Sequence, residues 1–147
     1  IPHRLEYLGK IEKLDFYNDS KATNFDSSVT GLQSVPSPII LLAGGIRKKG
    51  DCLNWIEQIK KSTNGIVLFG ISAKDLKEVI LKSCYKGEII LEDNLENATK
   101  ASINIARKTN SKTILLSPAC ASFDQYQNYE ERGDHFRKLV NKYGTIK

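Results

Sequence analysis

The chain contains no methionine and only two histidines and three cysteines among its 147 residues. Because even position 1 is not methionine, we expect the chain to be one domain of a longer protein. The cysteines, at positions 52, 84 and 120, are too far apart to predict a disulfide framework. They also have no familiar zinc-site spacing to His3 or His135. We therefore expect a reducing, cytoplasmic setting and no metal site.

Long apolar runs are also missing. None approaches the ~18–20 residues that a membrane-spanning helix needs, and the N-terminus lacks the layout of a signal peptide. No repeat, linker or low-complexity stretch divides the chain. A length of 147 residues and a hydrophobic fraction of 40% are ordinary for one globular unit. We predict a single domain over residues 1–147, with no membrane partner.

Positive charge exceeds negative charge, with 22 Lys and Arg against 17 Asp and Glu, for a net charge of +5. One interpretation is solvated lysine on helix surfaces. The other is an anionic ligand: a phosphate, a carboxylate or a nucleic acid. Composition alone leaves both open.

Short apolar runs alternate with amphipathic segments from residue 38 onward. The runs predict strands over residues 38–43, 65–70, 88–91 and 112–116. Helices are predicted between them and up to about Tyr143. Asp51 is the expected N-cap of one helix, Ser72 opens another with Asp75 as a capping box, and Asp93 and Glu96 start a third. Uninterrupted apolar strands separated by helices are typical of a mostly parallel sheet covered on both faces.

The first third of the chain has a different pattern. Residues 4–9 and 13–18 predict an N-terminal β-ribbon, whose second strand leads into a loop and a helix over residues 26–35. The predicted fold class is therefore α/β: a Rossmann-like, doubly wound, mostly parallel sheet with helices on both faces and an N-terminal β-ribbon.

Ligands of such sheets bind at the carboxyl ends of the strands. Three loops rich in small and hydroxyl residues fall at that edge, over residues 19–24, 44–51 and 117–125. Each loop alone has a local explanation as a turn, a cap or a solvated basic tip. Together they predict a site for an anion. We expect Cys120 to be a packed small residue and not a nucleophile, since no histidine lies near it in sequence.

Several nucleotide-binding motifs are absent. The sequence has no G-x-x-x-x-G-K-[ST] phosphate loop, no G-x-G-x-x-G and no carboxylate pair at metal-binding spacing. We therefore expect a chain that holds a substrate and part of a nucleotide but lacks the usual phosphate cradle.

The motifs that are present resemble those of the Mur ligases. Residues 18–24 are similar to that family's N-D-S-K-A-T-N motif, and His3-Arg4 resembles the His-Arg pair that opens its third domain. Residues 42–45 with Lys48 are similar to the family's second loop. Residues 116–133 closely resemble the S-P-A-C-A-S-x-D-x-F-x-N-F-x-x-R-G block of its D-glutamate-adding members. The resemblance covers essentially the whole chain, in order.

This resemblance implies a three-domain cytoplasmic enzyme of peptidoglycan synthesis. ATP would activate the carboxylate of UDP-N-acetylmuramoyl-L-alanine as an acyl phosphate, which the amine of D-glutamate would attack. The family's phosphate loop and Mg²⁺ ligands belong to its central domain. ATP and Mg²⁺ are thus expected for the full-length enzyme, with no metal ligand in this chain. The expected partners also include the protein's own N-terminal and central domains, without which this domain should be inactive.

The resemblance also implies roles for individual residues. Arg4 and Asp19 should face the nucleotide, Arg4 toward the phosphates and Asp19 toward the ribose. Lys21 should be the catalytic residue, close to the reacting phosphate.

The two carboxylates of D-glutamate are assigned in the same way. Thr23, Lys48 and Ser122, with the backbone N–H of Tyr129, should hold them. Tyr129 stands where phenylalanine is usual in the family. The run 47–49 offers Arg47, Lys48 and Lys49, and Lys48 is chosen by its spacing from Gly45.

Two alternatives remain open. One is the equivalent domain of a sister Mur ligase or of a folylpolyglutamate synthase, which should diverge in residues 117–133. The other is a basic module that binds nucleic acid. Aromatic residues are not interleaved with the basic ones, so we predict no nucleic-acid partner.

Overall fold

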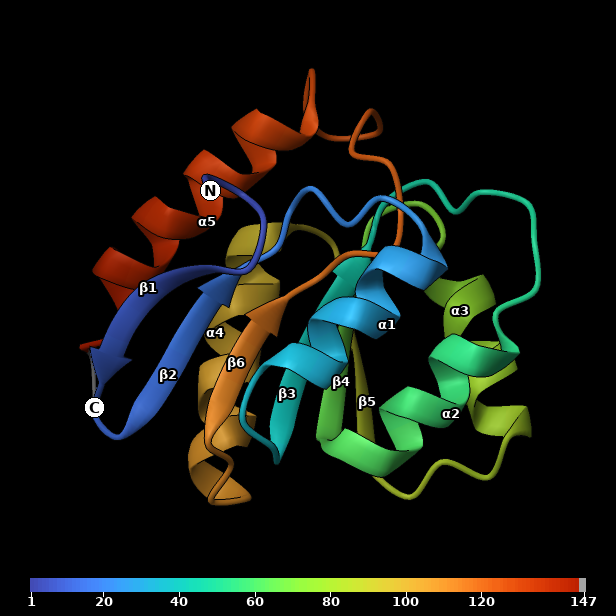
Figure 1. The fold of residues 1–147 in the computed structure, drawn as a ribbon, viewed down its shortest axis with the longest axis horizontal. Coiled ribbons are helices and arrows are strands. Elements are labelled where there is room, and N and C mark those ends of the chain that lie inside the picture. The colour runs from blue at the N-terminus through green and yellow to red at the C-terminus, as the bar shows by residue number, and fades with distance from the viewer. Residues whose placement is uncertain (146–147) are drawn as a thin grey trace.

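The sheet has six strands in the order β1-β2-β6-β3-β4-β5, and the computed structural model describes residues 1–145 (Figure 1). The strands are β1 (Glu6–Ile11), β2 (Leu14–Asn18), β3 (Ile39–Gly44), β4 (Thr63–Phe69), β5 (Glu88–Glu92) and β6 (Thr113–Leu116). The helices are α1 (Phe25–Ser34), α2 (Leu53–Ser62), α3 (Ala73–Lys82), α4 (Leu95–Lys108) and α5 (Tyr129–Tyr143).

Five strands pair in parallel, in the order β2-β6-β3-β4-β5, and β1 pairs antiparallel with β2 at one edge of the sheet. The predicted β-ribbon is therefore present, and its second strand is also part of the main sheet through its pairing with β6. The α/β, doubly wound fold class is confirmed. Of the helices in residues 1–145, none is both long and apolar enough to cross a bilayer.

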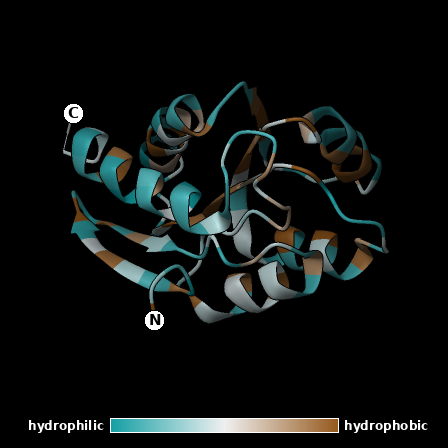
Figure 2. Cartoon of the chain, turned by 90° about the horizontal axis from the view of Figure 1, so that it is seen from above, coloured by the Kyte–Doolittle hydropathy of each residue, from teal (hydrophilic) through white to brown (hydrophobic). Residues whose placement is uncertain are grey.

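The central strand β3 explains why helices cover both faces of the sheet, because all six of its residues are buried. Side chains alternate between the two faces of a strand. Ile39 and Leu41 pack in one core with Trp55, while Ile40 packs in the other with Phe136. Each such buried aliphatic side chain stabilises the fold by about 1.5–3 kcal/mol. The continuous apolar run thus requires helices on both faces, as Figure 2 shows when the sheet is seen from above.

Three asparagines cap helices. Asn24, Asn94 and Asn128 each accept, through the side-chain oxygen, a hydrogen bond from the backbone N–H three residues on, at α1, α4 and α5. The predicted start of α4 at Asp93 lies two residues before the first helical residue, Leu95, and the cap is Asn94.

Two other predicted caps differ from the structure. The capping position of α2 is Cys52 instead of Asp51, although Asp51 Oδ1 accepts from Leu53 N–H at 2.8 Å. Ser72 does occupy the capping position of α3, but its hydroxyl makes no capping bond. It accepts instead from the N–H of Arg47, at 2.9 Å. A tertiary contact has replaced the local one that the sequence predicted.

Candidate functional site

Three loops meet at the carboxyl edge because β6 lies between β2 and β3 in the sheet. We call them the first loop (residues 19–24), the second loop (45–52) and the third loop (117–128). Backbone hydrogen bonds join the third loop to both others. Ala119 N–H donates to Ala22 O at 2.9 Å, and Ala121 and Ile46 exchange two bonds, each of 2.9 Å. The loops that the sequence singled out are thus one continuous surface.

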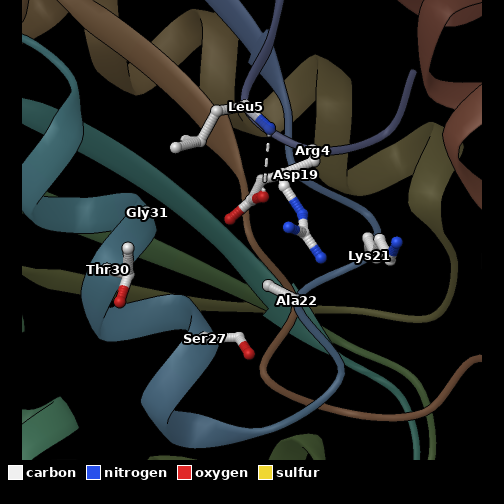
Figure 3. Close-up of a pocket in the computed structure, with 8 residues that line it drawn as sticks. All are labelled: Arg4, Leu5, Asp19, Lys21, Ala22, Ser27, Thr30 and Gly31. Carbon is white, nitrogen blue, oxygen red and sulfur yellow. Dashed lines mark hydrogen bonds between the residues drawn. The ribbon is translucent and has the colours of Figure 1, made fainter. Parts of the chain in front are cut away.

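A pocket of about 270 Å³ opens where the first loop faces helix α1 (Figure 3). Arg4, Asp19 and Lys21 line it from one side, and Ser27 and Thr30 line it from α1. These first three are the residues to which the resemblance assigns the nucleotide and the reacting phosphate. The structure places all three around one cavity, where the charge of Arg4 acts on the Asp19 carboxylate.

The carboxylate of Asp19 is fixed from two sides and only 4% exposed. Its Oδ1 accepts from Leu5 N–H at 3.1 Å, and its Oδ2 accepts from Ser117 Oγ at 2.7 Å. Burial raises the pKa of Asp19 to about 6, against the opposing effects of these two hydrogen bonds and of the Arg4 charge. The group is therefore mostly an anion at neutral pH but close to its titration range.

Gly31 allows helix α1 to lie against this carboxylate. A Cβ atom at position 31 would stand 2.4 Å from Asp19 Oδ2 and 2.9 Å from Ser117 Oγ. Gly31 was not among the residues predicted from the sequence. The available signal was a glycine inside a predicted helix, which destabilises a helix relative to alanine and can reflect a packing requirement.

Lys48 contacts the first loop directly. Its Nζ donates to Thr23 Oγ1 at 3.3 Å, which joins two of the residues assigned to D-glutamate. The neighbouring cations are placed differently. The Arg47 guanidinium lies 5.5 Å from the centre of the Phe25 ring, and Lys49 lines a separate cavity beside the starts of α1 and α2.

Ser122 and Tyr129 lie at the same edge and make no hydrogen bond to Lys48 among the described residues. Ser122 is 2% exposed, and its carbonyl oxygen accepts from Tyr126 N–H at 2.9 Å. Tyr129 is the first residue of α5, so its N–H is one of those that a helix leaves without an internal partner. Within residues 1–145, no hydrogen bond joins Ser122 or Tyr129 to Lys48 or Thr23. The structure therefore pairs two of the four predicted residues and places the other two separately.

Arg132 is a central residue of this edge to which the sequence analysis gave no role. Its guanidinium is 0% exposed and donates to Ser20 Oγ at 2.9 Å, to Ser20 O at 2.8 Å and to Cys120 O at 3.0 Å. Burial lowers its pKa to about 10, which still leaves it a cation at neutral pH. No salt bridge includes Arg132 in the part of the chain that the structure describes. The sequence signal was present, since Arg132 belongs to the block that resembles the Mur ligases.

Ser20 connects this arginine to helix α5. The Ser20 hydroxyl donates to Tyr129 O at 2.8 Å. Ser20 also stands between Asp19 and Lys21, two of the residues that line the pocket. Arg132 and Ser20 together therefore hold the first loop, the third loop and the start of α5 in one arrangement.

Cys120 is packed inside this network. Burial raises the pKa of its thiol to about 12, even though the charges of Arg132, Arg47 and Lys48 oppose the shift. A neutral, buried thiol is a poor nucleophile. The prediction that Cys120 is a packed small residue agrees with this environment.

The edge as a whole can bind anions. Arg4, Lys21 and Lys48 supply charge, and hydroxyl and backbone N–H groups supply further donors. Residues 1–145 contain no group of three or more His, Cys, Asp or Glu side chains that could hold a metal ion.

The chain is similar in sequence to known ligases, although no protein-family profile matches it. It is 74% identical over 147 residues to the UDP-N-acetylmuramoylalanine--D-glutamate ligase of Prochlorococcus marinus strain NATL2A, covering 100% of this chain and 31% of that protein. It is 49% identical over 139 residues to the enzyme of the same name from Rippkaea orientalis, covering 95% and 30%. The chain thus spans less than a third of the length of these relatives.

Two solved structures share the fold. The folylpolyglutamate synthase of Mycobacterium tuberculosis, complexed with ADP and AMPPCP, superposes with a TM-score of 0.67 at 10% identity, over 92% of this chain and 32% of that one. The UDP-N-acetylmuramate-alanine ligase MurC of Thermotoga maritima gives 0.60 at 13% identity, over 97% and 30%. At these identities the likeness concerns the fold alone.

Proposed function

Because this chain belongs to the Mur ligase family, we propose that it is the C-terminal, amino-acid-binding domain of a three-domain ligase. The whole enzyme would join D-glutamate to UDP-N-acetylmuramoyl-L-alanine in the cytoplasmic synthesis of peptidoglycan. The support for D-glutamate is sequence similarity across the full chain to proteins named for that reaction. The two structural neighbours share only the fold and do not favour another acceptor.

The pocket beside α1 fits part of a nucleotide. A volume of about 270 Å³ is at the lower limit for ligand pockets, so it suits a ribose and a phosphate better than a whole nucleotide. In the proposal, Arg4 and Lys21 bind phosphate oxygens. Each carboxylate oxygen of Asp19 retains a second lone pair that is able to accept a ribose hydroxyl. ATP, when bound, supplies the phosphoryl group that activates the substrate carboxylate as an acyl phosphate.

In the proposal, Mg²⁺ would be held by the rest of the enzyme and by the phosphates. This chain's own part in the phosphoryl step is then electrostatic. Lys21 places a positive charge at the pocket, where negative charge develops on the transferring group.

The contact between Lys48 and Thr23 is the structural observation on which the D-glutamate assignment depends. It joins the second loop to the first and presents an ammonium and a hydroxyl together, which suits one carboxylate. The Ser122 hydroxyl and the Tyr129 N–H at the start of α5 are assigned to the other carboxylate. Both carboxylates would then be bound while the amine of D-glutamate stays free to attack.

The test is phosphate release from ATP by the full-length ligase with UDP-N-acetylmuramoyl-L-alanine as acceptor. We expect release only when D-glutamate is added, and none from residues 1–147 alone because this chain has no phosphate loop to hold ATP. L-glutamate, L-alanine and L-lysine serve as matched controls. Stimulation by one of these, or by L-glutamate with a folate acceptor, would assign the chain to a sister ligase or a folylpolyglutamate synthase.

A separate titration addresses the nucleic-acid alternative. A random oligonucleotide should bind weakly at 50 mM salt. Tight binding that falls steeply with salt would favour a nucleic-acid module instead.

A further inference from the structure

A hydrogen bond between two side chains joins the third loop to helix α5. The Tyr126 hydroxyl lies 2.6 Å from His135 Nδ1, and the two ring centres are 5.7 Å apart. Tyr126 belongs to the third loop, which leads from β6 into α5, and His135 lies in the second turn of that helix (Figure 1). In the D-glutamate block that residues 116–133 resemble, the position of Tyr126 is phenylalanine, which has no hydroxyl. The bond is therefore a feature of this chain that the motif does not include.

The bond between Tyr126 and His135 does not depend on the protonation state of the histidine. Burial raises the pKa of Tyr126 to about 12, against the charge of Arg132, so the phenol keeps its proton at neutral pH. A phenol donates to an unprotonated imidazole nitrogen and accepts from a protonated one. One hydrogen bond thus persists whichever ring nitrogen of His135 carries a proton.

The two ends of this bond lead to Ser122 and Tyr129. Ser122 O accepts from Tyr126 N–H at 2.9 Å and from Gln125 N–H at 3.2 Å, which closes a turn over residues 122–126. His135 and Tyr129 belong to one helix and are separated by about 9 Å along its axis. The bond therefore links the turn that begins at Ser122 to the helix that begins at Tyr129.

Other hydrogen bonds hold the turn toward different neighbours. Asp124 Oδ2 accepts from Ile71 N–H at 3.0 Å, and Gln125 Nε2 donates to Asp93 O at 2.7 Å. Arg132 reaches the third loop from α5 at Cys120, which precedes the turn. Within residues 1–145, the bond to His135 is the one by which residues 122–126 are attached to α5.

We propose that Tyr126 and His135 are positioning residues for D-glutamate, because their bond sets the separation between the Ser122 hydroxyl and the Tyr129 N–H. This inference rests on the proposed function, in which those two groups bind the same carboxylate. Groups that share a ligand must be held within about 0.5 Å of the productive geometry by the residues that support them. The pair itself contacts no substrate and acts through Ser122 and Tyr129.

Kinetics of the full-length ligase test the pair, with D-glutamate-dependent phosphate release as the assay. Tyr126→Phe keeps the ring and removes the hydroxyl, and it should raise the KM for D-glutamate about three- to tenfold, as expected for one lost hydrogen bond. The kcat and the KM for ATP should change by less than about twofold, because only binding of the amino acid is weakened.

Tyr143→Phe is the matched control. The Tyr143 hydroxyl also makes a side-chain bond of 2.6 Å, to Glu96 Oε2, but at the last residue of α5 and far from its start. Its removal should leave the kcat and both KM values unchanged.

Two substitutions of His135 separate positioning from stability. His135→Asn keeps a polar atom at the place of Nδ1 and should retain most of the affinity for D-glutamate. His135→Leu has a similar size without that atom, and it should raise the KM as Tyr126→Phe does. Intrinsic helix propensity favours leucine over asparagine, so a role in helix stability alone predicts the opposite order. The double variant Tyr126→Phe with His135→Leu should be no worse than either single variant, since both remove the same bond.

Four results would overturn the proposal. They are an unchanged KM for D-glutamate in Tyr126→Phe, an equal change in Tyr143→Phe, equal values for His135→Asn and His135→Leu, and a parallel rise in the KM for ATP. The proposed function fails by a different result, which is phosphate release by the wild type with another amino acid and not with D-glutamate. The same variants would then be compared by their KM for that amino acid, and an unchanged value would overturn the positioning role as well.

Discussion

The two edges of the sheet use their polar side chains differently. At the carboxyl edge the hydrogen bonds join distant parts of the chain: Ser28 donates to Ser117 O across 89 residues, and Arg132 donates to Ser20 across 112. At the amino edge the spans are shorter: Asn64 donates to Ser111 Oγ across 47 residues, and several other bonds are local. Ser83 donates to Ile80 O three residues away, and Thr109 donates to Ile105 O four residues away.

Local bonds close turns whatever else surrounds them, whereas long-range bonds exist only when the strands are assembled. At the carboxyl edge, buried polar groups therefore fix the loops relative to one another. Such fixing is what a site needs when charges must be in place before the ligand arrives. The comparison makes specific predictions, which we give from the largest expected effect to the smallest.

The largest contrast should be in kcat/KM, between substitutions of a lysine at the carboxyl edge and of one at the amino edge. In the full-length enzyme, Lys48→Ala should reduce transition-state binding of D-glutamate by ~2–5 kcal/mol, measured as kcat/KM, because one carboxylate loses its cation. Lys60→Ala is the matched control, since Lys60 donates to Ser83 O at the amino edge and should have no kinetic effect. An unchanged kcat/KM for Lys48→Ala would transfer the role to Arg47 or Lys49.

The next largest effect should be on stability, in a comparison of the buried Arg132 with the more exposed Arg137. Arg132→Met should lower the free energy of unfolding of the chain by about 3 kcal/mol, because two buried carbonyl groups lose their donor. Arg137→Met should cost less than about 1 kcal/mol, since Arg137 makes half-exposed salt bridges to Glu6 and Asp134. Urea unfolding of both variants measures the difference. Equal losses would mean that the Arg132 network contributes no more than a surface ion pair.

The carboxylate of Asp19 should give stability a pH dependence. Burial raises its pKa from 3.8 to about 6. Between these two pH values the unfolded chain has lost this proton while the folded chain still holds it, so the folded state loses stability as the pH rises. The free energy of unfolding of the wild type should therefore fall by about 2 kcal/mol relative to Asp19→Asn between pH 4 and pH 7. A constant difference across this range would show that Asp19 is well solvated.

The smallest contrast concerns two serines. Ser28→Ala should cost about 1–2 kcal/mol, because Ser117 O and the Trp55 indole N–H both lose their partner in a buried site. Ser83→Ala removes one local bond near the surface and should cost less than about 1 kcal/mol. Thermal and urea unfolding of the two variants test this, and a reversed order would argue against the comparison of the edges.

Much of the fold was predictable because its signals are local. The four apolar runs correspond to β3, β4, β5 and β6, and the helices follow them as predicted. The resemblance to the Mur ligases, drawn from three loops and a short N-terminal motif, is confirmed by the relatives. The roles of Lys21, Thr23 and Lys48 remain predictions that the experiments above are designed to test.

Three of the differences, at Ser72, Gly31 and Arg132, come from contacts with residues far away in sequence. Asp51 and Ser72 looked like caps because their side chains suit that position, but Ser72 makes a tertiary bond to Arg47 instead. Gly31 and Arg132 were overlooked because neither is unusual in its own segment. Their importance comes from Asp19, Ser20 and Cys120, which lie far away in sequence.

The sequence by itself determined which segments become strands, which become helices, and which loops carry hydroxyls and cations, since these depend on periodicity and turn chemistry within a few residues. Only the tertiary structure decided that β6 inserts between β2 and β3, which brings the first and second loops onto either side of the third. Parallel pairing joins strands that lie far apart along the chain, and no local pattern specifies which strands become neighbours. The site exists because of that strand order.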